Sequence, residues 1–303
     1  MAEIPSSYNS SVFLSQPHSS QAPPISRANF YAQSLPQRLL GIGANSAQPR
    51  LGSSASSLAQ LGKHFVSYCE PLDELLDGGL AYGQMLEISG PPGTPREHLS
   101  SLFARQAMAR EEEVIYVVSQ NMTSPSTLRD VTGATNASLL HYDSIFTMTG
   151  LLAFLRTLPM YLDEHPTITL IILESFWFPF QETSSLSRTA RANLLAKVKL
   201  DLTHLCAERK VAIVTTSQLA TKLVHADGTP ANFETGAKAI LVPQLGTAYL
   251  QQSKAYRVII VPETRMSGQL RLLSSPSSSN DGDGKMVREV SYRISQGTMT
   301  RSA

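Results

Sequence analysis

The sequence lacks several features that mark secreted, metal-stapled and membrane proteins. Its two cysteines, Cys69 and Cys206, form no CxxC pair, and its seven histidines show no HxxxH spacing. Neither a disulfide framework nor a metal site is therefore indicated, and a reducing compartment is the default. The most apolar run, 168–173, is far shorter than the roughly 18 residues that a membrane helix needs. The N-terminus has no basic segment followed by an apolar one, so we expect neither a secretory signal nor membrane contact.

Charge is also scarce. Asp, Glu, Lys and Arg make up 16% of the 303 residues, below the roughly 25% typical of soluble domains, and the formal net charge is +1. This balance excludes a histone-like polycation and an acidic, solvating disordered chain. The hydrophobic share of 42% is large enough for a sizeable core.

The composition changes near residue 60. Residues 1–60 hold one of the 24 acidic residues, Glu3, and six of the 18 prolines, and they are rich in serine. Such a segment has too little apolar surface to offset the ordering entropy. We therefore predict a disordered Ser/Pro-rich arm over 1–60 and a core domain over 61–303. Within the arm, residues 30–40 are either a docking segment or a few apolar side chains in a polar tail.

Beyond residue 60, short apolar runs alternate with amphipathic ones. The predicted strands of the first half lie at 86–89, 114–119, 139–141, 168–173 and 211–215. The predicted helices lie at 95–110, 148–162 and 187–209. Strands separated by single helices predict an α/β fold with a mostly parallel sheet flanked by helices.

The last third of the sequence reads differently, because its apolar runs follow one another without helices between them. These runs lie at 239–242, 257–261, 270–273 and 287–294. They predict antiparallel strands toward the C-terminus. The run 274–284, rich in Ser, Gly and Asp, predicts a flexible hairpin tip.

The turn after the first predicted strand reads GPPGTPRE over residues 90–97. In a phosphate loop, GxxxxGK[ST], the second glycine admits the phosphates, the lysine binds them and the hydroxyl holds Mg²⁺. Here Gly90 is kept, but Pro95 replaces the second glycine, Arg96 the lysine and Glu97 the hydroxyl residue. Proline removes an N–H donor, and the glutamate places negative charge where a phosphate would lie. Arg96 keeps a positive charge, so nucleotide binding stays open as an interpretation.

The same letters have a second interpretation. Thr94, Pro95 and Glu97 fit a capping box, with the threonine as N-cap, the proline at the first helical position and the glutamate reaching back. A helix that begins in this way satisfies its own N–H donors and needs no anion.

Several blocks, taken in order, resemble the RecA-like core of eukaryotic and archaeal recombinases, and most of all the recombinase paralogues. The blocks are 72–80 (LDELLDGGL), Gly83, 90–94, 114–120, 170–175, 212–218, and 241–246 with Arg257. The resemblance covers about residues 61–303. It implies a RecA-like core, and the arm stands where full recombinases have a small helical DNA-binding domain.

The resemblance implies a degenerate nucleotide site with no confident catalytic residue. Its members are Gly90, Gly93, Thr94, Arg96, Glu97, Glu174 at the Walker B strand, and Gln218. Gln120 stands where the family has the catalytic glutamate, and its amide has no useful basicity. Losing such a base costs about 10²–10⁴ in rate, so we expect lost or weak ATPase activity and no required cofactor, with ATP and Mg²⁺ as the ligands that the family binds. Read without the resemblance, Glu174 and Gln218 are polar residues that close strands.

In the family two loops bind single-stranded DNA, and they correspond here to 177–190 and 219–238. The candidate DNA-binding cations in and beside them are Arg188, Arg191, Lys222 and Lys238. Binding along a backbone also needs stacking rings, and the rings beside the first loop are those of Phe176, Trp177, Phe178 and Phe180. The alternatives are a solvated helix face for the arginines and a subunit interface for the rings.

The resemblance therefore implies an accessory protein of homologous recombination and DNA repair in the nucleus. Its expected partners are other RecA-like recombinase paralogues or the recombinase itself, with single-stranded DNA bound through the complex. A DNA-dependent ATPase that uses Arg96 in place of lysine is one alternative. A RecA-like structural subunit of another complex, such as Elongator, is the other.

Overall fold

A computed structural model describes residues 64–133, 137–225, 229, 231–232, 238–246, 249–250, 255–276, 288–295 and 298–302. The predicted arm over 1–60, its segment at 30–40 and most of the predicted hairpin tip lie outside these residues. Those predictions, and the domain boundary at residue 60, therefore stay predictions.

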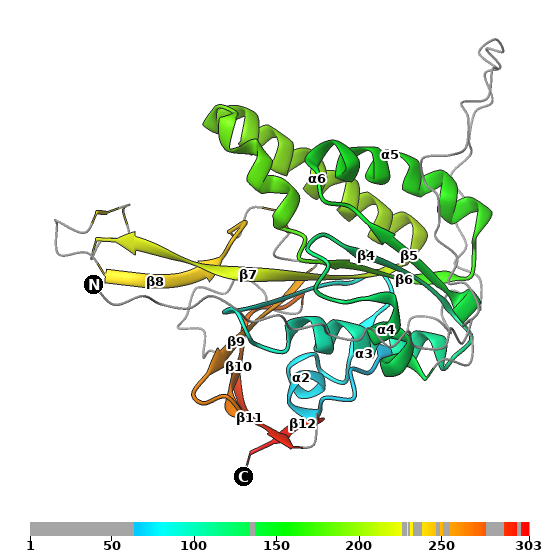
Figure 1. Ribbon diagram of the computed structural model, residues 1–303, viewed down its shortest axis with the longest axis horizontal. Coiled ribbons are helices and arrows are strands. Elements are labelled where there is room, and N and C mark those ends of the chain that lie inside the picture. The colour runs from blue at the N-terminus through cyan, green and yellow to red at the C-terminus, as the bar shows by residue number, and fades with distance from the viewer. Residues whose placement is uncertain are drawn as a thin grey trace, which may run out of the picture.

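Parallel strands form the centre of a large twisted sheet (Figure 1). In spatial order they are β5 (Leu140–Ser144), β4 (Glu113–Val118), β6 (Ile168–Glu174), β7 (Ala212–Val224), β3 (Met85–Gly90) and β9 (Ala255–Pro262). Helices connect β3 to β4 and β6 to β7, as parallel pairing requires. The predicted α/β class with a mostly parallel central sheet is confirmed.

Antiparallel strands extend this sheet beyond β9. They are β10 (Ser267–Ser274), β11 (Arg288–Ser295) and β12 (Thr298–Arg301), which confirms the prediction for the C-terminal part. β8 (Lys238–Pro243) pairs with the outer half of β7, and the two form a hairpin that projects from the body of the molecule (Figure 1). β7 is longer than the predicted 211–215 because this outer half finds its partner in β8 and not in the core. A separate two-stranded sheet joins β1 (His64–Phe65) to β2 (Leu80–Ala81).

Helices cover both faces of the sheet (Figure 1). One face carries α2 (Glu70–Leu75), α3 (Arg96–Met108) and α4 (Pro125–Thr132), and the other carries α5 (Met148–Glu164) and α6 (Arg188–Arg209). Two 3₁₀ helices, η1 (Ala137–Leu139) and η2 (Phe178–Ser185), precede β5 and α6. Within the described residues, every helix is too short or too polar to span a bilayer.

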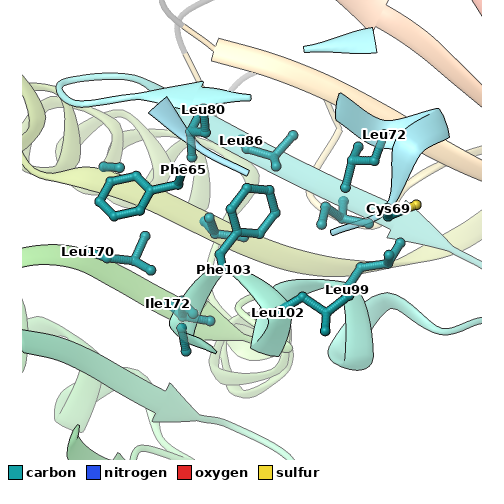
Figure 2. Close-up of a cluster of buried hydrophobic side chains, with 14 of the residues drawn as sticks. Phe65, Cys69, Leu72, Leu80, Leu86, Leu99, Leu102, Phe103, Leu170 and Ile172 are labelled. Atoms are coloured by element: carbon teal, nitrogen blue, oxygen red, sulfur yellow. The ribbon is translucent and has the colours of Figure 1, made fainter. Parts of the chain in front are cut away.

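The sheet separates two hydrophobic cores, and β6 contributes to both. Leu170 and Ile172 pack on the face of α3, close to Phe103 (Figure 2), whereas Ile171 and Leu173 face α5 and α6. Successive side chains of a strand point to opposite faces, so a continuous apolar run is what a strand buried on both sides requires. The expectation of burial on both faces is confirmed.

The two cysteines lie in different cores. Cys69 packs on the α3 face and Cys206 on the α5 and α6 face; both are buried and unbridged. Burial raises the pKa of the Cys69 thiol to about 12, so it behaves as an apolar side chain. The expected absence of a disulfide agrees with their position on opposite sides of the sheet.

A buried ion pair explains why the sequence block at 241–246 is accompanied by Arg257, which lies further along the chain. The guanidinium of Arg257, on β9, donates from Nη1 to the carbonyl of Gly246 at 3.1 Å and lies 3.7 Å from a carboxylate oxygen of Glu87 on β3. Both charged side chains are almost fully buried, and burial raises the pKa of Glu87. The arginine thus ties the segment after β8 to the centre of the sheet.

Candidate nucleotide-phosphate site

The predicted phosphate turn lies at the carboxyl edge of the parallel sheet. Gly90 is the last residue of β3 and pairs with Gln218 of β7, and Glu174 is the last residue of β6. The turn leads directly to α3, whose first residue is Arg96. Open α/β sheets bind their ligands at this edge, so the fold brings the predicted residues to the expected place.

Residues 91–94 form a turn that is held by its own groups. The backbone N–H of Thr94 donates to the Pro91 carbonyl at 3.3 Å, and the threonine hydroxyl donates to the same oxygen at 2.7 Å. Gly93 has a φ of +84°, which glycine adopts without strain. A Cβ atom at Gly90 would collide with the Thr94 hydroxyl. The turn itself therefore requires both glycines, whether or not a ligand binds.

The predicted capping box is wrong. Helix α3 begins at Arg96, and its N-cap is Pro95, which makes no side-chain capping bond. The Thr94 hydroxyl is committed to Pro91, and the Glu97 carboxylate pairs with Arg96 at 3.1 Å. Neither member of the box reaches the backbone group that it would cap.

Arg96 points into the protein. Its Nη1 donates to the carbonyl oxygens of Gly90 and Ser217, each at 3.1 Å, and its Nη2 faces Glu97. The side chain is 6% exposed. A guanidinium presents several donors in a rigid fork, and here the fork joins the ends of β3 and β7. The Nη1 and Nη2 atoms of the cation that would contact a phosphate therefore have partners within the chain, whereas its Nε is buried without a hydrogen-bond partner among the described residues.

Glu174 is fully buried and hydrogen-bonded. The Tyr116 hydroxyl, from β4, donates to Glu174 Oε2 at 2.8 Å, and the Ser100 hydroxyl lies 3.3 Å from the tyrosine oxygen. Burial raises the pKa of Glu174 to about 7, and the nearby carboxylate of Glu97 adds to this rise. A carboxyl with this pKa is about half protonated at neutral pH, which weakens it as a partner for Mg²⁺.

These contacts do not fit a magnesium nucleotide. Phosphate binding at a helix N-terminus needs free N–H donors and a free cation. The prolines at positions 91, 92 and 95 remove donors, and the Arg96 guanidinium is occupied by carbonyl groups. The Glu97 carboxylate adds negative charge at the start of the helix. The turn is held mainly by its own groups, although Nε of Arg96 and Oε1 of Glu174 are buried without a hydrogen-bond partner in the described part of the chain.

Gln120 lies two residues beyond β4, half-buried, at the same edge. The N–H of Ser119 before it donates to the backbone carbonyl of Glu174 at 3.1 Å. Its side-chain amide can orient a water molecule but cannot take a proton from it. The expectation that this position supplies no catalytic base remains a prediction.

The four candidate DNA-binding cations fall into two groups. Arg188 and Arg191 lie in the first turn of α6, and the second of them is exposed. Lys222 and Lys238 are exposed on the β7–β8 hairpin, where Lys238 pairs with Val224. Because Lys222 precedes Val224 by two residues, both lysines lie on one face of the hairpin, at a diagonal separation of about 7–8 Å. The hairpin thus carries a small basic patch on a projecting element.

The stacking interpretation of the rings beside the first loop is wrong for three of the four. Phe176, Trp177 and Phe180 are buried in the chain's own core, and the ring of Phe176 lies 5.6 Å from that of Tyr249. Rings that are covered by their own chain can neither stack on bases nor form a subunit interface. Phe178 is half-buried.

Sequence reasoning missed the groups that close this edge. Tyr116 lay within an apolar strand, and Ser217 acts through its backbone carbonyl, which carries no sequence signal. The tyrosine alone gave a hint, because a buried phenol hydroxyl needs a hydrogen-bond partner.

Comparison with known proteins finds relatives that include the three described below, and no protein-family model matches the chain. The chain is 24% identical over 152 residues to the DNA repair and recombination protein RadB of Methanobrevibacter smithii. This alignment covers 49% of the chain and 64% of the relative. It is 20% identical over 243 residues to the DNA repair protein RAD51 homolog 3 of Dictyostelium discoideum, with coverage of 69% and 61%. For the protein of the same name in Cricetulus griseus, the identity is 23% over 219 residues, with coverage of 61% and 56%. The chain therefore spans less than two-thirds of the length of these relatives.

The sheet order is that of an α/β protein with a mostly parallel sheet, which is consistent with a RecA-like core. The similarity to RadB and to RAD51 homolog 3 supports the resemblance to RecA-like recombinase paralogues that the sequence blocks predict.

Proposed function

We propose that the protein is an accessory factor of homologous recombination and DNA repair that acts in the nucleus without hydrolysing ATP. It assembles with other RecA-like recombinase paralogues, or with the recombinase itself, and supports the action of the recombinase on single-stranded DNA. The names of its relatives, which are DNA repair and recombination proteins, support the role in repair.

One observation carries the non-catalytic part of this proposal. The Arg96 guanidinium, at the position of the phosphate-binding lysine, donates to two backbone carbonyls of the chain itself. Opening that site for a phosphate would leave the carbonyls of Gly90 and Ser217 unpaired in a buried setting, which costs about 1–3 kcal/mol for each group. A folded RecA-like core with an occupied phosphate site suits a scaffold better than a motor.

The charge distribution favours DNA contact through a complex. A net charge of +1 provides no strong field toward DNA, and the candidate cations are few. The lysines of the projecting hairpin can add local phosphate contacts once a partner has positioned the protein. The variant Lys222→Ala/Lys238→Ala is expected to lower the salt slope of DNA binding by the complex by about 2, with Lys197→Ala on α6 as the matched control. An unchanged slope would remove the hairpin from the DNA interface.

Identification of the partners tests the proposal directly. The full chain is expressed with an affinity tag in its own organism, and the co-purifying proteins are identified by mass spectrometry after nuclease treatment, which removes DNA bridges. We expect RecA-like recombination proteins. Recovery of tRNA-modification proteins instead would favour the Elongator-type alternative. Normal damage resistance in a deletion strain, together with the absence of recombination partners, would overturn the proposal.

Nucleotide titration separates the scaffold from the DNA-dependent ATPase. Isothermal titration of ATP and ADP with Mg²⁺ at millimolar nucleotide, on the chain alone and on its purified complex, is expected to give no heat attributable to this chain. Binding together with DNA-stimulated hydrolysis that is lost in Arg96→Ala would establish the ATPase alternative.

A further inference from the structure

Three potential metal ligands converge at the amino edge of the sheet. Glu113 is the first residue of β4, His141 is the second residue of β5, and His165 follows the last residue of α5. With a rise of about 3.3 Å per residue, β4 separates them from the carboxyl edge by roughly 16 Å. The cluster is therefore distinct from the phosphate turn.

The His165–Glu113 distance is close to the spacing of zinc ligands, whereas a hydrogen bond holds His141 and Glu113 closer together, so these two must move apart by less than about 1 Å to admit an ion. Nε2 of His141 lies 2.7 Å from Oε2 of Glu113, and Nδ1 of His165 lies 3.6 Å from the same oxygen. One ligand atom from each residue falls within 4.8 Å of the others. Zinc bonds of about 2.0–2.2 Å in a tetrahedron place ligand atoms about 3.4 Å apart. The distance of 3.6 Å is too long for a hydrogen bond, so the His165 contact is not explained as one.

The surrounding contacts hold the ligands in the required orientation. The Tyr161 hydroxyl lies 2.7 Å from Nδ1 of His141, which leaves Nε2 directed at Glu113. The Thr167 hydroxyl donates to the second oxygen of that carboxylate. Metal-binding histidines and carboxylates usually have such partners on their remaining polar atoms. Backbone bonds, among them that of the His165 N–H to the Tyr161 carbonyl at 3.0 Å, fix the connecting segment.

We propose that Glu113, His141 and His165 form a binding site for a divalent transition-metal ion, with zinc the best match. Two imidazole nitrogens and one carboxylate oxygen form a zinc ligand set, whereas Mg²⁺ and Ca²⁺ prefer oxygen ligands. The side chains of His165 and Glu113 are 36% and 20% exposed, against 9% for His141, so a water molecule can complete the tetrahedron from the solvent side. The ion joins β4, β5 and the connection from α5 to β6.

Metal binding is tested on the full chain, with every affinity tag removed so that tag histidines cannot contribute. Zinc is measured by isothermal titration and by metal analysis after dialysis, and cobalt is added as a spectroscopic substitute. We expect one equivalent of zinc and the intense visible bands of four-coordinate cobalt. His165→Ala and Glu113→Gln should abolish both signals, and Tyr161→Phe should weaken zinc affinity by about 10–100-fold because it removes the partner of His141.

The matched control is His204→Ala. His204 and Glu208 lie one turn apart on the exposed face of α6 with 3.4 Å between Nδ1 and Oε1, and the described residues supply no third ligand beside them. This variant should retain both signals. Circular dichroism of each variant establishes that a lost signal is not lost folding. Less than one equivalent of zinc in the parent chain, or an unchanged cobalt spectrum in folded His165→Ala, would overturn the proposal and leave a hydrogen-bonded cluster.

Discussion

Polar side chains at the two edges of the parallel sheet differ in whether they are hydrogen-bonded within the chain. At the carboxyl edge, Arg96 is enclosed by Glu97 and by two backbone carbonyls, so its Nη1 and Nη2 donors are used within the chain. At the amino edge, Glu113 and His165 face each other across 3.6 Å without a hydrogen bond. The edge at which α/β folds usually bind ligands is closed here, and the opposite edge holds the arrangement that can accept one.

A pair of glutamates shows the same contrast. Burial raises the pKa of Glu174 at the carboxyl edge to about 7. Burial acts in the same direction on Glu113 at the amino edge, but hydrogen bonds from Thr167 and His141 outweigh it and hold the pKa below its usual value. A carboxylate that stays ionised can bind a cation, whereas one that is partly protonated and bonded to Tyr116 binds it poorly.

The largest expected effect comes from breaking the closed edge. Arg96→Ala removes a buried cation and leaves Glu97 and two carbonyls without their donor, which should lower the free energy of unfolding by about 3–5 kcal/mol. Urea denaturation measures this loss. Arg191→Ala, at an exposed position on α6, should change stability by no more than about 0.5 kcal/mol. A small effect at Arg96 would mean that its guanidinium is free for a ligand.

The second prediction concerns pH. Because the pKa of Glu174 is raised from 4.5 to about 7, the folded protein holds a proton in that window that the unfolded chain has released. Stability contributed by this group therefore falls as pH rises from 4.5 to about 7, by about 3 kcal/mol in total. Glu174→Gln, which does not ionise, should lose this decline.

The comparison of Glu174→Gln with the parent chain isolates the glutamate, since other buried carboxyls titrate in both proteins. Free energies of unfolding at about pH 5 and about pH 8 are sufficient. If the free energy of unfolding falls equally in the two proteins between these pH values, Glu174 is not the group whose titration lowers the stability.

Zinc should act at the amino edge with a somewhat smaller effect. At free zinc of about 100 times its dissociation constant, binding to the folded state alone adds about 2.7 kcal/mol to the free energy of unfolding. Urea denaturation with buffered zinc should show this gain in the parent chain and in His204→Ala, but not in His165→Ala. Equal gains in all three proteins would place the metal elsewhere.

The smallest expected effect is that of ATP. Millimolar ATP with Mg²⁺ should leave the melting temperature of the chain unchanged, because the phosphate position is occupied by Arg96. Differential scanning calorimetry with and without nucleotide measures this. A rise in melting temperature that disappears in Arg96→Ala would show that the carboxyl edge binds nucleotide and is not closed.

Much of the fold could be predicted from local patterns. The strand at 168–173 is apolar on successive residues, which requires cover on both faces, and the structure gives it two cores. Element ends were less certain. The predicted capping box at Thr94 does not form because a threonine hydroxyl has several possible partners, and here it donates to the carbonyl of Pro91.

The location of the candidate site could be predicted from the sequence, but the contacts of its side chains could not. Gly90 and Glu174 end their strands, and parallel strands bring their carboxyl ends to one edge; Gln218 pairs with Gly90 there but lies within β7, so the prediction that it closes a strand is wrong. The direction of the Arg96 side chain depends on the Ser217 carbonyl, which lies 121 positions away in the chain. No local pattern encodes that contact.

The sequence by itself determined the α/β class, the mostly parallel sheet with antiparallel strands toward the C-terminus, and the arginine at the position of the phosphate-loop lysine. The tertiary structure alone decided that Arg96 is buried with its Nη atoms bound within the chain and that Glu113, His141 and His165 converge. Burial, hydrogen bonding and ligand spacing depend on which distant segments pack together, whereas strand and helix patterns are written in neighbouring residues. The histidines lie too far apart in the sequence to form a motif, and only the pairing of β4 with β5 and β6 brings them together.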